Sequence, residues 1–171
     1  TFMGKGAVDC DSEYFLSTVG LGAIDFGDIA IKNSDLVITL GYDMVEYHPK
    51  LWRSNTNSNL IHIDFEAAEI DEYYIPEVEV VGDLAHSLTM LNNFIDKEKV
   101  PIFELDYLKK IKASIKEDRE KYINNKQIGS IKPQKFLHEL RQFMGKDDLL
   151  ISDVGAHKMW IARDFKCHEP N

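Results

Sequence analysis

Long apolar runs are missing from this sequence, and cysteine is scarce. No run approaches the roughly 20 apolar residues that a membrane-spanning helix needs, and no signal peptide is recognisable. The two cysteines, Cys10 and Cys167, are far apart in the chain and form no CxxC pair, so we interpret them as reduced thiols. The sequence therefore predicts a cytoplasmic protein that makes no contact with a membrane.

Basic residues are rare in the first part of the chain. Residues 1–96 carry 4 basic and 17 acidic side chains, which argues against a nucleic-acid surface there. Residues 97–135 carry 11 basic and 6 acidic side chains, and such a segment could contact RNA or a membrane. The same pattern is typical of a solvated helix that lies against an acidic surface, and we favour that interpretation. No nucleic-acid partner is predicted.

Complete glycine-rich phosphate fingerprints and metal-ligand spacings are also lacking. Gly4-Lys5-Gly6 has neither dinucleotide-binding nor P-loop spacing, so we interpret its glycines as turn residues. His62 alternates with Ile61 and Ile63, which predicts a position on a sheet surface rather than on a metal. Asp64 could accept a ribose hydroxyl, but without a fingerprint before it a loop-capping role is favoured. No other set of His, Cys or carboxylate residues has convincing ligand spacing.

Three apolar segments predict parallel strands: Leu36–Leu40, Asn59–Asp64 and Val78–Asp83. The first is nearly continuous and β-branched, which is typical of a strand buried on both faces of a parallel sheet. Short helices or loops separate the three segments, and Asp83 is a good N-cap for a helix. The fold class that follows is α/β, with a three-layer, Rossmann-like parallel sheet. Ligands of such sheets bind beyond the carboxyl ends of the strands.

The second half of the chain predicts a helical linker and the start of another α/β domain. We place the domain boundaries at 1–96, 97–130 and 131–171, with one exposed helix over Glu104–Asn124 inside the linker. Pro133 suits the first turn of the next helix, and Gly145 its end. Leu149–Asp153 predicts a fourth strand, followed by the turn Val154–His157 and a further helix. A strand, a glycine turn and a helix N-terminus together favour anion binding.

Five segments, taken in order, resemble the thiamine-diphosphate-dependent acetolactate synthases. They are TFMGKG, YFLSTVGL, DLVITLGYDMVEYHPKLW, LIHIDFEAAEIDEYYIPEVEVVGD and LLISDVGAHKMWIARDF. The resemblance covers nearly the whole chain and implies part of the sirtuin-type central domain followed by the opening of the cofactor-binding domain. Biosynthetic members, which hold FAD, have an Arg-Phe-Asp-Asp run where this chain has Tyr42-Asp43, and Gln where it has Ala156. These departures resemble the catabolic, FAD-independent type of acetoin fermentation, so FAD is not expected.

The resemblance implies an enzyme that condenses two pyruvates to 2-acetolactate and CO2 with thiamine diphosphate and Mg2+, as a homodimer or homotetramer. Val154, Gly155, Ala156 and His157 match the loop that contacts the cofactor diphosphate. The activating glutamate would lie upstream of Thr1 and the Mg2+ ligands downstream of Asn171, so the sequence is expected to be an inactive fragment with no catalytic or metal-binding residue of its own. His157 could instead hydrogen-bond its own turn.

Two alternatives stay open on the sequence. One is another thiamine-diphosphate-dependent enzyme, a 2-oxoacid decarboxylase or oxidase, because most residues that set substrate specificity would lie elsewhere. The other is a non-catalytic nucleotide-binding or assembly domain of similar topology. The stretch Asp148–Trp160 favours a thiamine enzyme over the second alternative.

Overall fold

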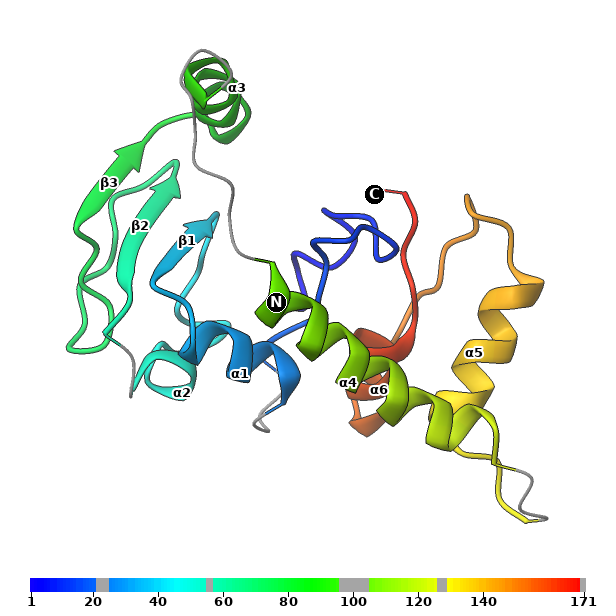
Figure 1. The fold of residues 1–171 in the computed structure, drawn as a ribbon. Coiled ribbons are helices and arrows are strands. Elements are labelled where there is room, and N and C mark those ends of the chain that lie inside the picture. Colours follow the sequence, from blue (N-terminus) through cyan, green and yellow to red (C-terminus); the bar gives the residue numbers. More distant parts are fainter. Residues whose placement is uncertain (21–24, 55–56, 96–104, 126–128, 170–171) are drawn as a thin grey trace. The chain divides into compact units, whose positions relative to one another are not determined.

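The computed structural model describes residues 1–20, 25–54, 57–95, 105–125 and 129–169 (Figure 1). The chain forms two compact units, one made of Thr1–Gly27 with Leu105–Asn171 and the other of Asp28–Glu104. The second unit contains a sheet, and the first contains three helices. No helix among the described residues is both long and apolar enough to cross a bilayer.

The sheet unit is built on three parallel strands in the order β1-β2-β3 (Figure 1). The strands are β1 (Leu36–Leu40), β2 (Asn59–Asp64) and β3 (Val78–Val81). Leu36 pairs with Asn59, and Ile61 of β2 pairs with Val78, so β2 is bonded on both sides. Within β2, Leu60 is fully buried, as expected of a central strand. The α/β class with a parallel sheet is therefore confirmed.

The expectation that Leu36–Leu40 is buried on both faces is wrong for this structure. Leu36, Ile38 and Leu40 are 42%, 45% and 49% exposed, whereas Thr39 between them is buried. Among the described strands β1 is an edge strand, and one of its faces has little packed against it. The apolar composition of β1 therefore reflects the strand propensity of its residues and not burial on both faces of the sheet.

Three helices accompany the strands: α1 (Phe26–Lys32), α2 (Lys50–Arg53) and α3 (Leu84–Ile95). The predicted N-cap of α3 is confirmed, since Oδ1 of Asp83 accepts a hydrogen bond of 2.7 Å from the His86 amide. Gly41, at the end of β1, has a φ of +56°, a value that glycine adopts without strain. The chain can therefore turn sharply where the strand ends.

The helical unit contains α4 (Asp106–Ile123), α5 (Pro133–Phe143) and α6 (Ala156–Asp164). Ile111 and Ile115, one turn apart on α4, are buried, as is Leu137 of α5. Pro133 occupies the first turn of α5, as predicted. Helix α4 is thus docked on its own unit through an apolar stripe, and its Lys112 and Arg119 also bond to residues of that unit.

The prediction of a fourth strand over Leu149–Asp153 is wrong. This segment is irregular, and Leu149 and Ile151 are 75% and 90% exposed. A strand exists only where its backbone groups bond to a neighbour, and no described strand lies in this unit. The proposed boundaries at 96 and 130 stay predictions, and residues 97–104 and 126–128 of the linker lie outside the described residues.

Candidate functional site

The loop that joins Asp153 to α6 is the first candidate site. Gly155 is the N-cap of α6 and has a φ of +149°, a conformation that side-chain-bearing residues rarely adopt. A Cβ at this position would lie only 2.8 Å from Cε1 of the His157 ring. Glycine is therefore favoured by the backbone conformation, and any larger residue would also displace the His157 ring.

The four predicted diphosphate-loop residues are contiguous and exposed, and Val154 is 82% exposed. The first amides of an α-helix have no partner within the helix, and the helix dipole favours an anion near them. Two amides here are already bonded: Val154 N–H, just before the N-cap, donates to Oδ1 of Asp153 at 2.6 Å, and Lys158 N–H donates to the Gly155 carbonyl at 3.1 Å. The remaining start of this nine-residue helix is compatible with a diphosphate, since Gly155, Ala156 and His157 are exposed residues.

His157 contacts its own turn. Its Nε2 lies 3.0 Å from the Asp153 carbonyl oxygen, which can only accept, so Nε2 donates this hydrogen bond. The alternative role that the sequence left open for His157 is thus present in the structure. The same ring remains exposed, so a ligand could compete for its donor.

Helix α6 is anchored by charged contacts at its C-terminal end. Arg163 forms an ion pair of 2.7 Å with Asp25, and Arg119 of α4 donates a hydrogen bond of 2.6 Å to the Arg163 carbonyl. Arg119 also lies 3.5 Å from Asp164, whose side chain is only 9% exposed. Burial nevertheless raises the pKa of Asp164, and it outweighs the attraction of Arg119 and Arg163. These contacts hold the C-terminal end of α6 against α4 and Asp25.

A second candidate site lies at the carboxyl ends of β1 and β2, in the sheet unit. A cavity of about 380 Å³ opens there, and Tyr42, His62 and Tyr74 are among the side chains that line it. Tyr42, Trp52 and Tyr74 form an aromatic cluster, with ring centroids 5.0 Å apart for Tyr42 and Tyr74. This is the edge at which open α/β sheets bind ligands.

The wall of this cavity contains a buried chain of hydrogen bonds. The Tyr74 hydroxyl lies 2.6 Å from Oγ1 of Thr39 and 2.8 Å from Nδ1 of His62. The other ring nitrogen of His62 donates to the Glu66 carbonyl at 3.1 Å. Tyr74 is 1% exposed and His62 is 3% exposed. His62 of β2 therefore lies on a covered face of the sheet, where it supports the fold through its bonds to Tyr74 and Glu66.

The cavity lining is acidic. Its carboxylates are Asp43, Asp64, Glu66 and Glu69, and its described lining includes neither lysine nor arginine. Tyr42 is already bonded, since its hydroxyl donates to the Tyr47 carbonyl and accepts from Nε1 of Trp52 at 3.2 Å. Burial raises the pKa of Tyr42 to about 12, so the hydroxyl stays protonated. Negative potential at this edge disfavours a ligand that carries phosphates.

The sequence did not reveal the role of Tyr74. It lies in the irregular segment between β2 and β3, where no periodicity assigns a face. Its partners Thr39 and His62 are separated from it by 35 and 12 residues. Only the pairing of β1 with β2 brings these side chains together.

Comparison with known proteins places the chain in a class. A family model described as the thiamine pyrophosphate enzyme central domain matches residues 1–91. This match covers more than half of the chain, so the chain belongs to the thiamine pyrophosphate enzymes.

The relatives of the chain narrow the class further. The chain is 29% identical over 99% of its length to "Acetolactate synthase" of Bacillus subtilis (strain 168), of which it covers 30%. It is 32% identical over 94% of its length to "Acetolactate synthase, catabolic" of Raoultella terrigena, of which it covers 29%. It is likewise 32% identical to "Acetolactate synthase large subunit" of Porphyra purpurea. The resemblance to acetolactate synthases is confirmed, and the chain spans less than a third of these relatives.

Proposed function

We propose that this chain is part of an acetolactate synthase, which joins two pyruvate anions and a proton to give 2-acetolactate and CO2. The observation that carries the proposal is the glycine-capped loop 153–157 at the start of α6, in a chain similar to acetolactate synthases over nearly its whole length. Thiamine diphosphate and Mg2+ are the cofactors that this proposal requires. Bound thiamine diphosphate supplies the nucleophilic carbon and accepts the electrons released on decarboxylation.

In this proposal the residues of the chain bind and orient rather than react. Val154, Gly155, Ala156 and His157 hold the cofactor diphosphate, with accessible amides at the helix start and one imidazole donor. Gly155 allows the backbone to approach the diphosphate closely, since it has no Cβ. The ion pairs of Arg163 with Asp25 and of Arg119 with Asp164 keep α6 in place beneath the loop.

We further propose that the protein belongs to the catabolic type and holds no FAD. The acidic cavity at the sheet edge supports this, because its carboxylates repel the phosphates of a dinucleotide. Tyr42, which stands where biosynthetic members have the start of an Arg-containing run, is bonded to Tyr47 and Trp52. A cytoplasmic location, consistent with the free thiols of Cys10 and Cys167, and a homodimeric or homotetrameric assembly complete the proposal.

The experiment that tests the proposal is an assay of the full-length protein that contains this chain. Pyruvate, thiamine diphosphate and Mg2+ are supplied, and acetolactate is measured as the acetoin that forms on acid decarboxylation. The proposal expects acetolactate, and none when thiamine diphosphate is withheld. Acetaldehyde or acetyl phosphate as the main product would instead establish a decarboxylase or an oxidase. The 171-residue chain assayed alone is expected to be inactive, because it spans less than a third of the relatives that it matches.

A further inference from the structure

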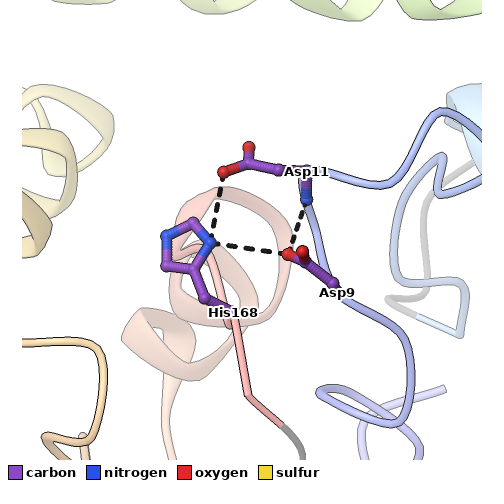
Figure 2. Close-up of side chains that lie close together, drawn as sticks. All are labelled: Asp9, Asp11 and His168. Carbon is purple, nitrogen blue, oxygen red and sulfur yellow. Dashed lines mark hydrogen bonds and ion pairs between the residues drawn. The ribbon is translucent and has the colours of Figure 1, made fainter.

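Asp9, Asp11 and His168 meet in the helical unit, although 157 residues separate Asp11 from His168 (Figure 2). Nδ1 of His168 lies 3.5 Å from Oδ1 of Asp9 and 3.2 Å from Oδ2 of Asp11. Each residue offers one ligand atom, and the three atoms all lie within 4.8 Å of one another. An imidazole nitrogen thus faces two carboxylates that belong to a distant part of the chain.

The backbone holds the two segments in register. Cys10 N–H donates to the Cys167 carbonyl at 2.9 Å, and Cys167 N–H donates to Sγ of Cys10 at 3.2 Å. Asp9 and Asp11 flank Cys10, and His168 follows Cys167. The hydrogen bonds between Cys10 and Cys167 therefore place the three side chains on facing segments. The segment after Asp11 is held as well, since Nζ of Lys112 donates to the carbonyls of Ser12 and Glu13 at 2.6 and 2.9 Å. The three side chains are therefore positioned before any ligand arrives.

From this geometry we propose that Asp9, Asp11 and His168 form a binding site for a divalent transition-metal ion, of which Zn2+ is the best probe. Ligand atoms about 2.1 Å from a tetrahedral zinc ion lie about 3.4 Å from each other, which is close to both distances from Nδ1 of His168. One nitrogen and two carboxylate oxygens suit zinc or manganese better than calcium or magnesium, which prefer oxygen ligands alone.

The surroundings of the three residues favour binding over a closed ion pair. Nζ of Lys166 holds the other oxygen of Asp11 at 2.6 Å, which orients Oδ2 toward His168. Asp11 and His168 also line a cavity of about 890 Å³ within the helical unit, so water can reach the remaining coordination positions. With Lys166 counted, Asp9 and Asp11 leave one net negative charge, which attracts a cation. The proposal does not depend on the proposed enzymatic function.

The test is a calorimetric Zn2+ titration of the purified chain and its variants. The account expects one equivalent of Zn2+ in the original chain, and at least tenfold weaker binding in His168→Ala and in the double variant Asp9→Asn, Asp11→Asn. His86→Ala is the matched control, since His86 is an exposed histidine of the other unit, and it should bind Zn2+ unchanged.

Two further variants separate this site from its neighbours. Cys10→Ser with Cys167→Ser should leave Zn2+ binding intact, and loss of binding there would assign the metal to the thiols and overturn the proposal. His168→Asn keeps a hydrogen-bond donor for the carboxylates but is a poor zinc ligand, so it should stay folded by circular dichroism and still lose binding. Unchanged binding in His168→Asn or His168→Ala would show that the three residues form only an ion pair.

Discussion

The hydroxyl of Tyr74 lies 2.8 Å from Nδ1 of His62, inside the sheet unit and almost out of reach of solvent. The same hydroxyl bonds Thr39 of β1 at 2.6 Å, so one atom links the irregular segment after β2 to two neighbouring strands. Buried polar groups that lose a partner are costly, because water cannot replace it. Removal of this hydroxyl should therefore lower the stability of the sheet unit.

Replacing Tyr74 with Phe removes only this hydroxyl and leaves Thr39 and His62 without their shared partner. We expect the free energy of unfolding to fall by about 1–3 kcal/mol, the cost of leaving a buried polar group unsatisfied. Urea denaturation followed by circular dichroism measures the change. Tyr14→Phe is the control, since Tyr14 is 63% exposed, and it should change stability by less than about 0.5 kcal/mol. Equal stability of the two variants would contradict the buried network.

Asp164 predicts a dependence of stability on pH. Burial raises its pKa above the unfolded value of 3.8, so folding favours the protonated carboxyl. The stabilisation is complete below pH 3.8 and is lost as the pH rises through the folded pKa. The free energy of unfolding of Asp164→Asn should thus rise relative to that of the original chain as the pH rises above this value. Urea denaturation at several pH values measures the difference. The exposed Asp147→Asn is the control, and a parallel response of both variants would refute the assignment to burial.

Flavin binding tests the proposal that the protein is of the catabolic type. The full-length protein, incubated with FAD and passed through gel filtration, should emerge without flavin absorbance, because the cavity at the sheet edge is lined by four carboxylates. A flavin-holding biosynthetic acetolactate synthase, treated in the same way, is the positive control. Flavin retained in stoichiometric amount would overturn the assignment to the catabolic type.

The sequence predicted local structure well where the pattern and the caps agree. Asp83 and Pro133 began helices where expected, and the three apolar segments became the three strands. Leu149–Asp153 has the composition of a strand, yet no described neighbour pairs with it. Strand formation depends on partners that composition does not identify, whereas helix caps act within one turn.

The candidate sites also differ in whether their residues are close together in sequence. The start of a helix after the turn Val154–His157 was predictable because its glycine, its histidine and the helix are adjacent in sequence, and the binding of a diphosphate there stays a prediction. The contacts of Tyr74 with Thr39 and the approach of His168 to Asp9 join residues far apart in the chain. No local spacing indicates such contacts, because they arise from strand pairing or from the pairing of two irregular segments.

The role of His157 in cofactor binding is the central claim. Its hydrogen bond of 3.0 Å to the Asp153 carbonyl is the competing role, and the two roles predict different effects of one substitution. If His157 donates to the diphosphate, His157→Ala in the full-length protein removes a hydrogen bond to a charged group, worth about 1.5–3 kcal/mol. This corresponds to roughly ten- to hundredfold weaker apparent affinity for thiamine diphosphate. His86→Ala, which removes an exposed histidine of α3, is the matched control and should leave the affinity unchanged.

The most direct measurement is therefore a thiamine diphosphate titration of the full-length protein and its His157→Ala variant, with acetolactate formation as the readout. The account predicts that the variant needs ten- to hundredfold more cofactor for half-maximal activity. It also predicts that saturating cofactor restores most of the activity, since binding rather than chemistry is impaired. An unchanged titration curve, accompanied by a lower melting temperature of the variant, would show that His157 only caps its own turn and would contradict the claim.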